Sequence, residues 1–190
     1  MQAQRADYRQ QLAAVRPEDL VFVDESGVHR AMTRLYARSP RGQRAHGSAP
    51  RNDGDNVSVL GALSLHGPVA GLCVPGSTDG EVFRTFVERG LVPALWPGAV
   101  VVLDNLSTHK VKGVREAIEA VGARLVYLPP YSPDFNPIEL AWSQLKAHLR
   151  KAAARTTTAL YRAIADAFAA ITPTHARGYF AHCGYCGSLP

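Results

Sequence analysis

The sequence predicts an α/β domain with a mixed five-stranded sheet and helices on both of its faces. Dense apolar runs at 20–23, 100–103 and 123–128 predict strands that are covered on both sides, as is typical of α/β sheets. Apolar residues at helical spacing over 79–91 and 111–121 predict helices before and between the later strands. With 190 residues and 46% hydrophobic content, the chain is long enough for one well-packed domain.

The N-terminal third begins with a polar stretch, residues 1–18, whose few apolar positions suit a short helix ended by Pro17. The run 20–23 then predicts the first strand, which we expect to end at Asp24. Residues 30–36 are expected to add a further extended segment.

The middle of the chain predicts a β-hairpin followed by a helix. Residues 57–65 and 69–74 form its two strands, joined by a turn at 66–68. The helix over 79–91 can be capped by Asp79. This hairpin and the first strand supply three of the five strands.

The last third contains the longest helix. A proline-rich loop follows the strand at 123–128 and leads into a helix over 137–152, and a final helix is expected near 157–171. The expected organisation is a linker or helix remnant, then the core, then a C-terminal helix and tail packed on the core: residues 1–18, 19–155 and 156–190.

Arginine supplies almost all of the positive charge. Of 21 basic residues only four are lysine, and the formal net charge is +5. The planar guanidinium suits phosphate recognition, so this balance favours a polyanionic partner. A genome-wide preference for arginine would give the same composition, so charge alone does not decide.

Cysteine and hydropathy patterns argue against a zinc-binding protein and against a membrane or secreted protein. Cys183 and Cys186 form a single C-x-x-C, and no second pair exists to complete a four-ligand zinc site. No apolar run approaches the ~20 residues that span a membrane, and the start of the chain lacks the apolar core of a signal peptide. We therefore expect a cytoplasmic protein without a membrane partner.

Three acidic residues lie at expected element edges. Asp24 follows the first strand, Asp104 follows the strand at 100–103, and Glu139 lies in the first turn of the long helix. Carboxylates at the ends of buried strands can share a crevice and stay ionised. Without His or Cys ligands they favour Mg²⁺ or Mn²⁺, and two such ions about 4 Å apart support in-line phosphoryl transfer. We expect the three carboxyl groups to converge.

Each acid also has an ordinary structural explanation. Asp104 can belong to a turn, and Asp24 to a polar strand exit. Glu139 can belong to a helix start that Asn136 caps, with Pro137 at the first position.

The two faces of the long helix favour a functional role for Glu139. Its polar stripe contains Glu139, Ser143, Lys146 and Arg150, and its apolar stripe contains Ile138, Ala141, Trp142, Leu145 and Leu149. The carboxylate therefore shares its face with cations suited to phosphate.

Three sequence blocks together resemble transposases of the mariner superfamily, and among them the bacterial insertion-sequence-630 family. The blocks are Val21-Phe22-Val23-Asp24-Glu25-Ser26-Gly27, Val102-Leu103-Asp104-Asn105 with His109, and Leu128-Pro129-Pro130-Tyr131-Ser132-Pro133-Asp134-Phe135-Asn136-Pro137-Ile138-Glu139 with Trp142 and Lys146. Thirty-four residues separate Asp104 from Glu139, a spacing typical of that family. The resemblance covers roughly residues 18–185.

This resemblance implies an RNase H-like catalytic core in which Asp24, Asp104 and Glu139 form the acidic triad and bind two Mg²⁺ or Mn²⁺ ions. The implied chemistry is hydrolysis at the ends of a mobile element, followed by attack of the freed 3′-hydroxyl on target DNA. The implied partners are element-end and target DNA and a second copy of the chain, which places the protein at the nucleoid when it is on DNA.

Family members usually carry helix-turn-helix modules ahead of the first acid, whereas 23 residues precede Asp24 here. We expect either a second reading frame, with the upstream portion supplied by a first frame, or a truncated form. The alternative function is a catalytically silent fragment that binds DNA or inhibits a full-length transposase. An aspartyl-phosphate enzyme is disfavoured, because no acid stands two residues after Asp24.

Candidate DNA contacts come from two segments. Residues 26–52 contain six arginines and no acid, and they lie where mariner relatives carry an insertion that reaches toward DNA and the partner subunit. The candidates are Arg34, Arg38, Arg41, Arg44, Lys146 and Arg150. A solvated basic loop is the alternative explanation. His109, Asn105 and Glu25 neighbour the triad and can orient ligands, but they are not assigned to the catalytic set.

Overall fold

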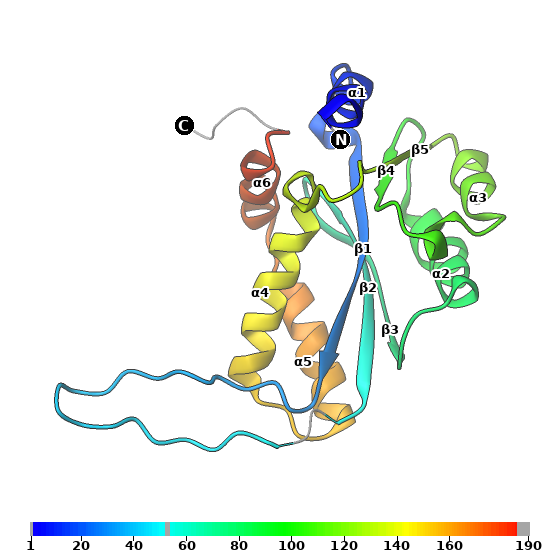
Figure 1. Cartoon of the computed structure of the whole chain (residues 1–190). Helices are drawn as coiled ribbons and strands as arrows, with labels where there is room; N and C mark the ends of the chain where they lie inside the picture. The colour runs from blue at the N-terminus through cyan, green and yellow to red at the C-terminus, as the bar shows by residue number, and fades with distance from the viewer. Residues whose placement is uncertain (1, 52–53, 186–190) are drawn as a thin grey trace.

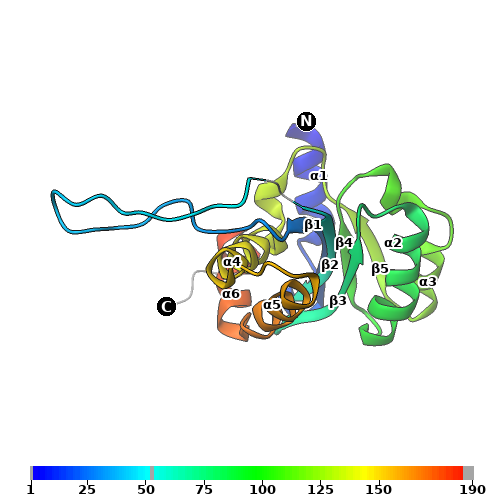
Figure 2. The same cartoon turned by 90° about the horizontal axis from the view of Figure 1, so that it is seen from below.

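The computed structural model describes residues 2–51 and 54–185, in which a five-stranded mixed sheet lies between two layers of helices (Figures 1 and 2). The strands are β1 (Leu20–His29), β2 (Asn56–Ser64), β3 (Gly67–Pro75), β4 (Val100–Leu103) and β5 (Arg124–Tyr127). Their order across the sheet is β3-β2-β1-β4-β5. β1 pairs antiparallel with β2 and parallel with β4, so the sheet is mixed, and the predicted fold class is confirmed.

Six α-helices and five shorter helical segments, four of 3₁₀ and one of π type, complete the described chain. The α-helices are α1 (Gln2–Leu12), α2 (Gly80–Phe86), α3 (Val114–Ala120), α4 (Pro137–Ala152), α5 (Thr157–Ala169) and α6 (Pro173–His182). The shorter segments are η1 (Pro17–Asp19), η2 (Val87–Leu91, the π-helix), η3 (Val92–Ala94), η4 (Ser107–Lys110) and η5 (Pro133–Phe135). No helix of the described part is long and apolar enough to cross a membrane.

The alternation of side chains along β1 divides the core in two. Phe22 packs with Trp142 of α4 and meets Phe180 of α6 edge-on, with ring centroids 5.3 Å apart. Val21 and Val23 point the other way, into the core formed with α2 and α3. Figure 2 shows these layers, with α4, α5 and α6 on one side of the sheet and α2 and α3 on the other. Successive side chains of β1 therefore pack against the helix layers on opposite faces of the sheet.

β1 is longer than predicted. Its second half, Glu25–His29, pairs with β2 alone, because the parallel ladder with β4 stops at Val23. Burial alternates there, with Val28 buried and Gly27 exposed, so this half lacks the dense apolar run that marks the first half. The expectation that the strand ends at Asp24 is therefore wrong.

The extended segment expected at 30–36 forms no strand. The chain turns at 30–31 and continues without regular structure, and residues 34–51 are all exposed. We call residues 33–51 the basic arm, which projects away from the body in Figures 1 and 2. Its base is fixed by the Arg155 guanidinium, which donates to the carbonyls of Arg30 at 2.9 Å and Met32 at 3.1 Å.

The tail contains a helix that the sequence did not predict. α6 begins at Pro173 and is capped by Thr172, whose hydroxyl accepts from the His175 N–H. Cys183 follows it as a free thiol, and Cys186 lies outside the described residues.

Candidate active site

The register between β1 and β4 places two of the three acids side by side. Val23 is paired with Leu103 at the last step of the parallel ladder. Asp24 and Asp104 are the next residues on the two neighbouring strands. A crevice opens where β4 ends, and crevices of this kind hold ligands in α/β sheets.

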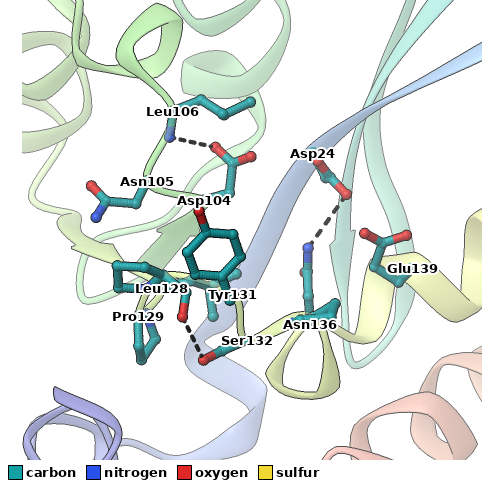
Figure 3. Close-up of a pocket in the computed structure, with 12 residues that line it drawn as sticks. Asp24, Asp104, Asn105, Leu106, Leu128, Pro129, Tyr131, Ser132, Asn136 and Glu139 are labelled. Carbon is teal, nitrogen blue, oxygen red and sulfur yellow. Dashed lines mark hydrogen bonds between the residues drawn. The ribbon is translucent and has the colours of Figure 1, made fainter. Parts of the chain in front are cut away.

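All three acids line one pocket of about 400 Å³. Its other lining residues come from the segments after β4 and β5 and from the residue before α4: Asn105, Leu106, Leu128, Pro129, Pro130, Tyr131, Ser132, Pro133 and Asn136. Figure 3 shows Asp24 and Glu139 on one side of this pocket and Asp104 across it. Three separate elements therefore contribute one carboxylate each.

Asp24 is buried, with 8% of its surface exposed, and three groups donate hydrogen bonds to its carboxylate. They are the Glu25 N–H at 2.8 Å, the Trp142 indole N–H at 3.2 Å and the Asn136 amide at 3.4 Å. Burial raises the pKa of Asp24 to about 7, and the Glu139 and Asp104 carboxylates add to this rise. The donors favour the charged form but do not offset the loss of hydration.

The partners of the Asp104 carboxylate come from the residues that directly follow it in the chain. It accepts a hydrogen bond from the Leu106 N–H at 3.1 Å and contacts Nδ1 of His109. His109 is 1% exposed and stacks on Phe83 of α2, with centroids 4.1 Å apart. Within the described residues no three His, Cys, Asp or Glu side chains form a ready metal-binding group. The three carboxylates line the same pocket, the contact with Nδ1 holds Asp104 toward His109, and their convergence on a shared cation stays a prediction.

Glu139 lies in the first turn of α4 and is exposed. Asn136 occupies the N-cap position of α4 with Pro137 at the helix start, as the alternative explanation placed them, but no side chain caps the helix there. The Asn136 amide is directed to Asp24 instead (Figure 3). Glu139 and Asp24 lie on the same side of the pocket in this view.

The donor set fits hard divalent cations. Three carboxylates share the pocket, and in the described structure the buried Oδ1 of Asn136 has no hydrogen-bond partner. Oxygen donors of this kind suit Mg²⁺ and Mn²⁺. Burial raises the pKa of Asp24, repulsion from Glu139 and Asp104 adds to that rise, and a bound cation would relieve this repulsion.

The six basic residues expected to contact DNA fall into two groups, and none of them lines the pocket. Arg34, Arg38, Arg41 and Arg44 are exposed on the basic arm. Lys146 and Arg150 lie on the solvent side of α4, whose predicted apolar stripe is buried as expected. The arm leaves the body close to the C-terminal end of α4 (Figure 1).

Several residues of the site were not assigned to it from the sequence. Trp142 was named in the apolar stripe and in the third sequence block but not as a partner of Asp24, although a buried indole N–H requires an acceptor, and that requirement was the available signal. Tyr131 has a left-handed backbone, with φ of 54°, and is 88% exposed at the pocket. No sequence pattern distinguishes it from the rest of the proline-rich loop.

Comparison with known proteins identifies the family of the chain and proteins that share its fold. Residues 19–161 match the family model described as DDE superfamily endonuclease. No curated protein matches the chain. Among solved structures, the Mos1 mariner paired end complex with Mn has a TM-score of 0.73 at 17% identity, covering 95% of this chain and 56% of that one. The chain thus spans about half the length of that relative.

Structures of the catalytic domain alone are covered more completely. The catalytic domain of Mos1 mariner transposase has a TM-score of 0.68 at 13% identity, covering 95% of this chain and 84% of that one. A structure of the same domain with Raltegravir and Mg has a TM-score of 0.69 at 14% identity, with coverages of 94% and 85%. These likenesses confirm the RNase H-like fold, and the family match over 19–161 shows that the chain belongs to the DDE superfamily endonucleases.

Proposed function

We propose that this chain is the catalytic domain of a DNA transposase, with Asp24, Asp104 and Glu139 as its catalytic acids. The observation that supports this most strongly is the sharing of one pocket by three carboxylates from β1, the end of β4 and the start of α4. The family match supports phosphodiester chemistry, and the Mos1 structures solved with Mn or Mg support divalent cations as cofactors. We propose two such ions.

The residues of the chain have distinct tasks in this proposal. Bound Mg²⁺ or Mn²⁺ would supply activation of the attacking oxygen and stabilisation of the leaving oxygen. Asp24 must be ionised to act as a ligand, and because burial raises its pKa to about 7, the fraction that is protonated near neutral pH has to lose its proton. Trp142 and Asn136 hold its carboxylate in place. The Leu106 N–H and His109 do the same for Asp104.

DNA is the proposed substrate, and the basic arm and α4 are its proposed binding surface. Replacing Arg34, Arg38, Arg41 and Arg44 by alanine should reduce the slope of log affinity against log salt by about 0.9 for each phosphate that the variant no longer neutralises. Arg162→Ala, on the exposed side of α5, is the matched control and should leave the slope unchanged. Equal slopes in the arm variant and the control would contradict this assignment.

The assembly is proposed from the relatives. The matching Mos1 structures include a paired end complex and a strand transfer complex, which supports element-end DNA, target DNA and a second copy of the chain as partners. We also propose that an upstream helix-turn-helix portion supplies sequence recognition, whether in the same chain or from a separate reading frame.

Nicking of supercoiled plasmid DNA in Mn²⁺ tests the triad directly. Asp24→Asn, Asp104→Asn and Glu139→Gln should each lower the rate by at least about 100-fold, because each removes a ligand that stabilises charge in the transition state. Asp166→Asn, an exposed acid of α5, is the control. Nicking that persists in Asp104→Asn would refute the triad. DNA binding by the wild-type chain without any nicking would favour a silent, DNA-binding fragment instead.

A further inference from the structure

Helix α1 holds the loop that leads into the proposed active site. We call residues 128–136 the active-site loop. The Arg5 guanidinium donates to both carboxylate oxygens of Asp134, at 3.0 and 2.5 Å, and to the Ser132 hydroxyl at 2.9 Å. A bidentate pair of this kind fixes orientation as well as distance. One side chain of α1 is therefore joined to two residues of the loop.

Aromatic contacts strengthen this attachment at Phe135. The ring of Tyr8 stacks on that of Phe135, with centroids 5.5 Å apart and an interplanar angle of 17°. The guanidinium carbons of Arg5 and Arg9 lie 4.1 and 4.9 Å from the centroid of the same ring. Tyr8 and Phe135 are both buried, so they form part of the core rather than a surface contact.

A pair of hydroxyls ties the backbone of the loop to α1 as well. The Tyr185 hydroxyl donates to the Phe135 carbonyl at 2.6 Å. It lies 2.7 Å from the Tyr8 hydroxyl, and because its single proton is already used, Tyr8 is the donor in that contact. The backbone at Phe135 is thus fixed through the segment after α6, which α1 in turn holds.

The residue after Phe135 is the first that touches the proposed triad. The Asn136 amide donates to Asp24, and Glu139 follows in the first turn of α4. We propose that α1 is a positioning strap: it holds the active-site loop so that Asn136 meets Asp24 and Glu139 projects into the pocket. Arg5 is a positioning residue here and not a catalytic one. The effect on cation binding rests on the proposed function, whereas the effect on the loop does not.

Hydrogen exchange of the full, metal-free chain tests the strap. Arg5→Ala should speed exchange of the backbone amides of 135–141 by at least about three-fold, because local opening becomes easier. It should also weaken binding of Mn²⁺ alone, measured by electron paramagnetic resonance. Exchange should return toward the wild-type rate in the charge-reversed pair Arg5→Asp with Asp134→Arg. Arg16→Ala is the matched control, since Arg16 forms a bidentate pair with Asp19 away from the loop.

The outcomes separate the strap from the proposed function. Faster exchange confined to α1, with residues 135–141 unchanged, would overturn the strap, because α1 would then only lie on the surface. Faster exchange with unaltered Mn²⁺ affinity would overturn its role in the cation site. If the wild-type chain itself bound no Mn²⁺, the proposed function would fail, and the exchange data alone would still decide whether α1 positions the loop.

Discussion

Gly61 provides a direct test of how the sheet positions Trp142. In β2 it is the residue paired with Asp24, and the indole of Trp142 packs across it. A Cβ atom at Gly61 would lie 2.6 Å from Cη2 of Trp142 and 3.3 Å from Cζ of Phe168. Trp142 is 3% exposed and has no room to withdraw, so Gly61→Ala must shift the ring or the strand.

The expected cost follows from two terms. Overpacking of a buried site costs about 1–3 kcal/mol, and a displaced indole also loses its hydrogen bond to Asp24, worth about 1 kcal/mol or more. Gly61→Ala should therefore lower the free energy of unfolding in urea by about 2–4 kcal/mol. Gly71→Ala is the matched control on the paired position of β3, because its Cβ would meet nothing closer than 3.6 Å.

A double-mutant cycle identifies the cause. Trp142→Phe removes the atoms that clash, so the cost of Gly61→Ala should shrink by at least about 1 kcal/mol in that background. If Gly61→Ala proved as stable as Gly71→Ala, or cost the same with and without Trp142, the reasoning from the contact with the ring would be refuted.

Three other substitutions have expected outcomes. The folded pKa of Asp24, about 7, exceeds its ordinary 3.8, so its contribution to stability is complete below pH 3.8 and is lost as pH rises through 7. Asp24→Asn should remove this loss, of which about 2.5 kcal/mol falls between pH 5 and 8, in urea titrations of the metal-free protein at those two pH values. His109→Phe keeps the stacking on Phe83 but loses the contact with Asp104, and should lower Mn²⁺-dependent nicking by about 10-fold or more with little change in stability. Ala153 ends α4 in a left-handed conformation, with φ of 48°, so Ala153→Gly should stabilise the chain by about 0.5–1 kcal/mol in urea.

Each of these three predictions has an outcome that would contradict it. A stability difference between pH 5 and 8 that survives in Asp24→Asn would assign it to other groups. Nicking by His109→Phe at the wild-type rate would show that the contact with Asp104 is dispensable. A destabilised Ala153→Gly would mean that the entropy of the unfolded chain outweighs the relieved strain.

The elements that the sequence predicted best are those in which one physical signal dominates. β4 is a pure apolar run that lies at 100–103 as predicted, and α4 begins at Pro137 and carries an uninterrupted apolar stripe. The second half of β1 was not predicted because it is half-solvated and pairs on one side only. α6 was not predicted because its apolar residues are few and its Gly178 weakens the helical signal.

The candidate site likewise contains residues that the sequence predicted and residues that it did not. Asp104 and Glu139 stand at element boundaries, and Asp24 follows the dense apolar half of β1, so the order of apolar runs indicates all three. The partners of Asp24 could not be predicted in this way, because Trp142 and Asn136 reach it from more than a hundred residues away in the chain. Contacts of this kind depend on the packing of α4 against β1, which no local pattern encodes.

Asp24 occupies a position that is unfavourable for the free protein. Phe22 and Val28 lie on the same face of β1 and simply pack into the core, whereas burial raises the pKa of the Asp24 carboxyl to about 7. The chain nevertheless directs the Trp142 and Asn136 donors at that carboxylate. Donors that favour the charged form, at a position where burial opposes charge, are better explained by a bound cation than by folding stability.

The end of β4 explains why the second acid is held differently. Leu103 is the last residue of β4 in the ladder with β1, so Asp104 has no strand partner there to fix its direction. His109 supplies that support from the next turn, and its stacking on Phe83 connects the acid to α2. Of two neighbouring acids, then, Asp24 is fixed from the α4 layer and Asp104 from the α2 layer. A substitution in either helical layer should therefore disturb one acid and spare the other.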